Sequence, residues 1–78
     1  MSQIKALSDL KAHSKGKVKQ VSGQGQLKRK LLDMGIVPGS NLEVIRVAPF
    51  GDPVEVRIKG YNLSLRKEEA KQISIEVI

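Results

Sequence analysis

The stretch VSGQGQLKRK, residues 21–30, combines the parts of a phosphate-binding loop. A strand, a pair of glycines and a basic helix start can together cradle a phosphate group. The spacing, however, fits neither standard motif. A Rossmann turn needs a third glycine where Lys28 stands, and a P-loop needs glycine, lysine and then Ser or Thr in place of Lys28, Arg29 and Lys30. We therefore interpret the stretch as a flexible connection to a helix and not as a nucleotide site.

Side chains for catalysis or metal binding are sparse. The chain has one histidine, one tyrosine and no cysteine, and it contains neither an HExxH nor a GxSxG pattern. His13 lies among lysines, which disfavour a bound cation. The acids Asp9, Asp33 and Asp52 are scattered along the chain. We predict that the protein is not an enzyme and has no catalytic, cofactor-binding or dedicated metal-binding residues.

Basic residues are concentrated in the first part of the chain. Lys and Arg total 14 against 8 Asp and Glu, for a net charge of +6. Residues 1–31 hold eight bases and one acid, whereas residues 32–78 hold six bases and seven acids. This asymmetry predicts one basic face, which would attract nucleic acid, an anionic membrane or an acidic protein. Phe50 and Tyr61, the two aromatic residues, lie in the nearly neutral part, which weakens the case for nucleic acid because single-strand binders stack bases on aromatics near their cations.

The length of 78 residues, without repeats or a linker-like segment, predicts a single domain over residues 1–78. Because there is no cysteine, the fold cannot depend on disulfides or a cysteine zinc site, which suits a reducing cytoplasm. No apolar run reaches the length of a signal peptide or of a membrane span. We expect a soluble, cytoplasmic protein.

The elements that must position these residues begin with an extended segment and one helical turn. Ile4, Leu7 and Leu10 recur at a spacing of three, with Ser8 as a candidate N-cap. The following KGKVKQV, residues 15–21, predicts a strand with its lysines on the solvent face and Val18 on the other. Lysines in such positions discourage pairing at a sheet edge. These lysines are Lys15, Lys17 and Lys19.

An amphipathic helix is predicted over QLKRKLLDM, residues 26–34, because its apolar residues recur at spacings of four and three. The bases Lys28, Arg29 and Lys30 fall largely on its other side. Gly35 is placed to end the helix in a left-handed cap, after which Ile36 can fold back onto the last turn. The next four residues, VPGS, suit a type II turn.

Five further elements follow. The β-branched residues of NLEVIRVA, residues 41–48, occur on both parities and predict a strand partly covered on both faces. VEVRIKG then alternates, with Val54, Val56 and Ile58 inward, so the two strands should form an antiparallel hairpin around PFGDP. A bend at Gly60, a strand YNLSLR, a short helix in KEEAKQI and a terminal strand ISIEV complete the chain. The pattern predicts a mainly β fold with short helices, as a small antiparallel barrel that removes its edges by closing.

Phe50 stands between two prolines in the APFGDP turn. Two positions for its ring are open: an exposed loop tip, which is a recognition feature, or a plug folded down into one end of the barrel.

Several blocks of sequence, spaced over residues 3–78, fit one known family. They are the helix end LLDMG, the turn VPG, the loop APFGDP, the strand GYNLSLR and a closing Glu-Ala helix. Together they resemble the FeoA family, the small cytosolic component of bacterial ferrous iron transport. The resemblance implies an SH3-like barrel with an inserted helix, and a partner, the FeoB membrane transporter with its cytosolic GTPase domain. The residues that match the family framework are Asp33, Gly35, Pro38, Gly39, Gly60 and Tyr61, and those that match its variable-tipped loop are Pro49, Phe50, Gly51, Asp52 and Pro53.

These observations predict a non-enzymatic accessory protein that binds a FeoB-type ferrous iron transporter. The candidate partner-binding residues are Lys28, Arg29 and Lys30 together with the loop residues 49–53. The sequence shows no set of ligands for iron, so it does not support iron binding and leaves that question open. Two alternatives are a nucleic-acid-binding barrel and an SH3-like module of the kind found in iron-dependent repressors of the DtxR type. Since no helix-turn-helix precedes the module, we expect a stand-alone protein.

Overall fold

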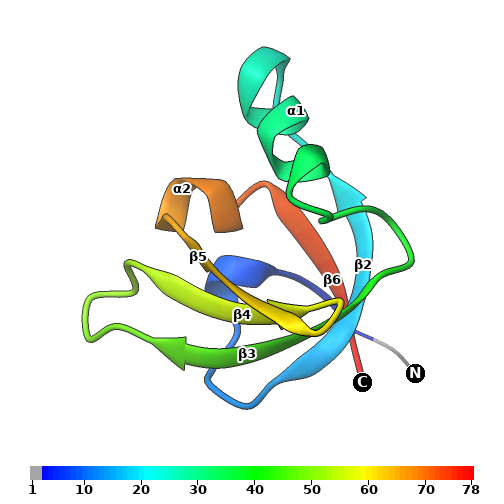
Figure 1. The fold of residues 1–78 in the computed structure, drawn as a ribbon. Coiled ribbons are helices and arrows are strands. Elements are labelled where there is room, and N and C mark those ends of the chain that lie inside the picture. The colour runs from blue at the N-terminus through cyan, green and yellow to red at the C-terminus, as the bar shows by residue number, and fades with distance from the viewer. Residues whose placement is uncertain (1–2) are drawn as a thin grey trace.

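Six strands form one bent antiparallel sheet in the computed structural model, which describes residues 3–78 (Figure 1). The strands are β1 (Gln3–Ala6), β2 (Lys15–Val21), β3 (Asn41–Val47), β4 (Val54–Ile58), β5 (Tyr61–Leu65) and β6 (Ile73–Val77). Their order in the sheet is β1-β6-β2-β3-β4-β5. The sheet curls around one apolar core, and the predicted mainly β barrel with a β3–β4 hairpin is confirmed.

Three short helices accompany the sheet: η1 (Leu7–Asp9), α1 (Gly25–Asp33) and α2 (Lys67–Ala70). Helix α1 connects β2 to β3 in the chain, and Figure 1 shows it projecting from the body of the molecule. Helix α2 packs beside η1. The predicted extended segment and helical turn at the N-terminal end are confirmed, but Ser8 is not the cap. Ala6 holds the N-cap position and makes no side-chain hydrogen bond, so the turn begins at Leu7, two residues earlier than a cap at Ser8 would place it. Over residues 3–78 no helix is long and apolar enough to cross a bilayer.

A β-bulge explains the apolar residues on both parities of β3. Val44 pairs with Val56 and Arg46 with Glu55, so Ile45 is an extra residue that has no partner in the ladder. Val47 then pairs with Val54. Because an inserted residue reverses the alternation, Val44 and Val47 lie on the same face. The apolar residues on both parities of β3 are therefore explained by the bulge, and not by burial of both faces of the strand as predicted.

The position of β2 differs from the one expected for a lysine-rich strand. It lies inside the sheet, between β6 and β3, so its lysines do not protect an edge. The two edge strands are β1 and β5, and among residues 3–78 they are not paired with each other. Backbone hydrogen bonds therefore do not close the barrel, and the prediction that it removes its edges by closing is wrong. Lys5 of β1 pairs with Ile75 and is itself exposed, so this edge strand carries a charge. A charge in that position opposes pairing with another chain.

The segment LLDMGIVPGS ends α1 and attaches it to the sheet. The N–H of Gly35, whose φ is +91°, donates to Leu32 O at 3.0 Å, and the N–H of Ile36 donates to Leu31 O at 3.1 Å. This pair of bonds is the Schellman ending of a helix, and the fully buried Ile36 packs back on the last turn as predicted. In the following turn, the N–H of Ser40 donates to Val37 O at 3.1 Å. The turn residues 39 and 40 also exchange two backbone hydrogen bonds with Val18 of β2.

Candidate functional site

The basic face of α1 consists of Lys28, Arg29 and Lys30, all of them exposed, while Leu31 on the other side is fully buried. The amphipathic arrangement predicted for this helix is confirmed. The three bases differ in one respect. Lys30 Nζ lies 2.8 Å from Glu69 Oε2, so this lysine already has an acidic partner within the protein. In the described part of the chain, Lys28 and Arg29 form no such ion pair.

Glu69 connects α1 to α2. Among residues 3–78 it is the one buried charged residue, at 7% exposed, and its Oε1 accepts the backbone N–H of Arg66 at 2.8 Å. The hydrogen bond from Lys30 and then the one from Arg66 lower the pKa of Glu69, against the opposing effect of burial. This contact was not predicted from the sequence, because the usual capping signal has Ser, Thr, Asp or Asn three residues before the glutamate and here an arginine stands there.

Two of the three lysines of β2 have acidic neighbours across the sheet, whereas the exposed Lys19 lies at a shift in register and has no partner in the ladder. Lys15 pairs in register with Glu43, and Lys17 with Glu76. Residues directly opposite one another on a sheet have side chains about 5 Å apart at Cβ, so their charges compensate. The charge asymmetry along the chain is therefore reduced in space at the sheet, since β2 lies between two strands from the acidic part.

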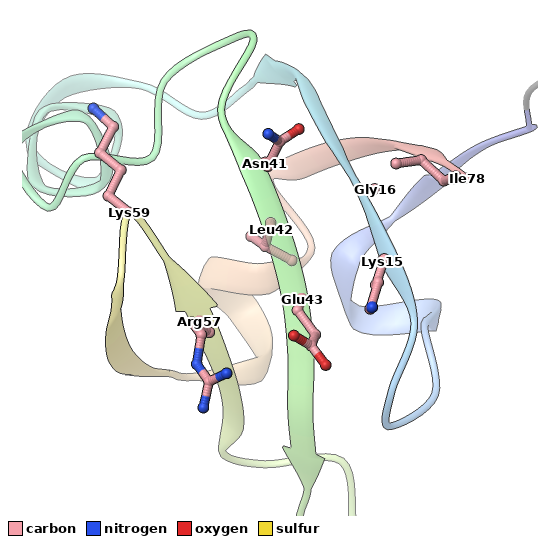
Figure 2. A pocket seen from close by; sticks show the side chains of 8 residues that line it. All are labelled: Lys15, Gly16, Asn41, Leu42, Glu43, Arg57, Lys59 and Ile78. Carbon is pink, nitrogen blue, oxygen red and sulfur yellow. The ribbon is translucent and has the colours of Figure 1, made fainter.

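A groove of about 410 Å³ opens on this side of the sheet. Figure 2 shows Glu43 between Lys15 and Arg57, with Lys59 pointing away from these three. Arg57 Nε donates to Asn62 Oδ1 at 3.3 Å, which orients the guanidinium along the sheet. The cations of the groove thus have a counter-charge of their own. The groove is lined by Lys15, Gly16, Asn41, Leu42, Glu43, Arg57, Lys59 and Ile78.

The β3–β4 loop presents Phe50 to solvent. The ring is 92% exposed, so the position as a barrel plug is excluded and the exposed loop tip is the observed one. Gly51 N–H donates to Ala48 O at 2.7 Å and Ala48 N–H donates to Pro53 O at 3.1 Å, which closes the loop below the ring. Asp52 Oδ1 accepts a long hydrogen bond of 3.4 Å from the N–H of Lys67, the first residue of α2.

Two residues of the family framework meet at the end of α1. Tyr61 Oη donates to the carbonyl oxygen of Met34 at 3.1 Å, and it lies 2.9 Å from the point that a Cβ on Gly35 would occupy. Sequence reasoning identified both residues but not their contact, which joins positions 26 residues apart. Of the other framework residues, Asp33, Pro38 and Gly39 are exposed around the helix end and Gly60 lies in the β4–β5 turn.

His13 is exposed and adopts a left-handed backbone conformation with φ of 74°. Within residues 3–78, no group of three or more His, Cys, Asp or Glu side chains is placed to hold a metal ion.

A family model described as the FeoA domain matches residues 5–77. The chain belongs to the FeoA domain family. It is 40% identical over 72 residues to a fusion protein of Fe(2+) transport protein A and the Fe(2+) transporter FeoB from Porphyromonas gingivalis, covering 92% of this chain. The chain spans only 8% of the length of that relative.

Solved structures of FeoA proteins share the fold. A FeoA-like protein from Clostridium acetobutylicum is 42% identical, with a TM-score of 0.89 over 100% of this chain and 91% of the other. FeoA from Stenotrophomonas maltophilia, solved with zinc and described as a prokaryotic SH3 domain protein, is 26% identical, with a TM-score of 0.79 over 97% of this chain and 89% of the other. The expected SH3-like FeoA fold is thereby confirmed.

Proposed function

We propose that this FeoA-domain chain is a non-enzymatic, single-domain accessory protein of ferrous iron transport. It acts in the cytosol by binding the cytosolic part of a FeoB-type transporter.

The observation that carries the proposal is the fusion of both parts in one relative, where a segment 40% identical to this chain is joined to a transporter. Covalent linkage holds two modules at an effective concentration on the order of millimolar, which suits partners that work in contact. A separate chain with the same fold must reach that contact through its own binding surface.

The surface available for such binding includes the basic face of α1. Lys28 and Arg29 are exposed at the helix that projects farthest from the sheet, and neither is paired with an acid in the described residues (Figure 1). Exposed charges act chiefly on the rate of association and are screened by salt. Lys28 and Arg29 therefore steer the chain toward an acidic surface of the transporter, while Lys30 contributes less because Glu69 holds it.

Direct binding of this chain to the isolated cytosolic part of the FeoB-type transporter tests the proposal, measured by biolayer interferometry with and without GTP. We expect saturable binding that weakens as ionic strength rises. A duplex DNA and a single-stranded RNA serve as comparison ligands. If the chain binds these nucleic acids and not the transporter, the proposal is wrong.

A further inference from the structure

Phe50 is the most exposed of the large apolar side chains in residues 3–78. The others are Ile4 at 56%, Tyr61 at 47% and Ile78 at 87% exposed. The exposure of Tyr61 has a structural reason, since its hydroxyl donates to Met34 O. Phe50 makes no such bond and offers the solvent a complete phenyl ring, which is unfavourable in water and favourable in a partner's cavity.

The loop holds this ring in a defined place. Two backbone hydrogen bonds close the loop at its base, and Asp52 joins it to the first residue of α2. Pro49 and Pro53 flank the tip and limit its backbone freedom further. A side chain presented on such a platform loses little conformational freedom on binding, so more of its contact energy appears as affinity.

The short helix α2 joins this loop to the basic face of α1. Asp52 of the loop accepts from the N–H of Lys67, and two residues later Glu69 pairs with Lys30 of α1. Figure 1 shows α2 between α1 and the β3–β4 loop. The two segments that are 20 residues apart in the sequence thus flank one stretch of surface, which we call the α2 surface.

The excess of positive charge on the α2 surface favours an acidic partner. Its bases outnumber its acids, and one base lies beside the tip: Lys67 Nζ is 3.9 Å from the point that a Cβ on Gly51 would occupy. Of its acids, Asp52 and Glu69 are engaged within the protein. In α1, α2 and the residues that flank α2, the bases are Lys28, Arg29, Lys30, Arg66, Lys67 and Lys71, and the acids, together with Asp52 of the loop, are Asp33, Glu68 and Glu69.

We infer that Phe50 is the anchor of a composite docking site on the α2 surface. The ring enters an apolar cavity of the transporter's cytosolic part, and a carboxylate at the rim of that cavity meets Lys67. This inference rests on the proposed function and adds a division of roles. Phe50 determines how long the complex lasts, because buried aromatic anchors act mainly on dissociation, whereas Lys28 and Arg29 determine how fast it forms.

Association and dissociation rates on the immobilised cytosolic part of the transporter test this division. Phe50→Ala should raise the dissociation rate at least tenfold and change the association rate less than twofold. Lys67→Glu should also raise the dissociation rate. The matched control is Ile78→Ala, which removes a similarly exposed apolar side chain, at 87% against 92% for Phe50, from the groove of Figure 2 and should bind as the unmodified chain does. Thermal melting should be unchanged in Phe50→Ala, since the ring makes no core contact.

Three results would be decisive against this inference. If Phe50→Ala binds with the kinetics of the unmodified chain, Phe50 is not the anchor, although the proposed function stands. If Ile78→Ala weakens binding instead, the docking site is the groove and not the α2 surface. If the unmodified chain does not bind the transporter part at all, the proposed function and the anchor both fall.

Discussion

Gly35 and Tyr61 fix the end of α1 from two distant parts of the chain. The glycine ends the helix because its φ of +91° is strained for any residue with a side chain. The tyrosine then occupies the space that such a side chain would need, with its hydroxyl on Met34 O. One position is thereby restricted twice, by backbone conformation and by a neighbour, and the direction in which α1 projects follows from both.

Gly35→Ala should therefore destabilise the fold by more than conformational strain alone, which is roughly 1 kcal/mol. Urea denaturation measures the change. Gly39→Ala is the matched control, because Gly39 has the same φ, +92°, and open space where its Cβ would be. We expect the larger loss at Gly35 and a partial recovery when Tyr61→Phe is combined with it. Equal losses at the two glycines would show that the tyrosine hydroxyl is not a steric restraint.

Gly16 is restricted by space alone. It is buried in β2, and a Cβ there would come within 2.6 Å of the carbonyl oxygen of Glu76 as well as against the Ile75 side chain. Since a backbone oxygen in a paired strand cannot move aside cheaply, Gly16→Ala should cost about 1–3 kcal/mol, the range for overpacking. A free energy of unfolding equal to that of the unmodified chain would contradict this close approach of β2 and β6.

At the scale of elements, the attachment of α1 to the body depends on few contacts. The helix is held by the buried Leu31 and Ile36, by the turn bonded to Val18, by the Tyr61–Met34 hydrogen bond and by the Lys30–Glu69 ion pair. The partly buried residues of the helix and its C-cap that also pack against the core are Leu27, Leu32 and Met34. Glu69 serves both helices, because one of its oxygens accepts from the start of α2 and the other meets Lys30. The ion pair therefore sets where the basic face of α1 lies relative to the loop that carries Phe50.

Glu69→Gln should weaken this attachment, since glutamine can still accept the Arg66 N–H but carries no charge for Lys30. We expect a loss of roughly 0.5–1 kcal/mol, as for a half-exposed ion pair, and faster amide hydrogen exchange in α1. Glu68→Gln, on the exposed side of the same helix, is the control and should leave exchange in α1 unchanged. Unaltered exchange in Glu69→Gln would mean that the ion pair does not hold the helix.

The Glu69 carboxylate should also make the stability of the fold depend on pH. Its folded-state pKa is lowered from the ordinary value of 4.5, so its contribution to stability is present above that value. It is lost as the pH falls through the lower folded-state pKa, because the unfolded chain binds the proton first. The stability difference between the unmodified chain and Glu69→Gln should therefore shrink as the pH is lowered below about 4.5. Denaturation midpoints from pH 7 to pH 3 measure it, and a constant difference would contradict the assignment.

For the whole molecule, the distribution of charge in space matters more than the distribution along the chain. Lys15 and Lys17 of β2 face Glu43 and Glu76 across the sheet. Lys67 of α2 lies beside the loop that carries Phe50, and within residues 3–78 Lys28 and Arg29 of α1 form no ion pair. Long-range attraction to an acidic partner should therefore come from the α2 surface.

Lys28→Glu with Arg29→Glu should lower the association rate with the transporter part about tenfold or more at low salt and reduce its salt dependence. The matched control is Lys15→Glu with Lys17→Glu, which makes the same change in net charge at the sheet and should have a much smaller effect. Equal effects of the two double variants would show that net charge alone, and not its position, controls association.

The sequence by itself determined the local features of this protein. Apolar spacing in residues 26–34, the glycine at 35 and the alternation in β4 specified a helix, its end and a hairpin strand, because each depends only on neighbours along the chain. The blocks from LLDMG to GYNLSLR identified the FeoA family for the same reason.

Only the tertiary structure decided which distant residues meet. Register across the sheet put Lys15 opposite Glu43, the bulge at Ile45 changed which residues of β3 share a face, and the position of α2 brought Glu69 to Lys30. The exposure of Phe50 was likewise open until the loop could be placed against α2. These contacts depend on strand pairing and packing between segments far apart in the chain, and no local pattern of residues specifies them.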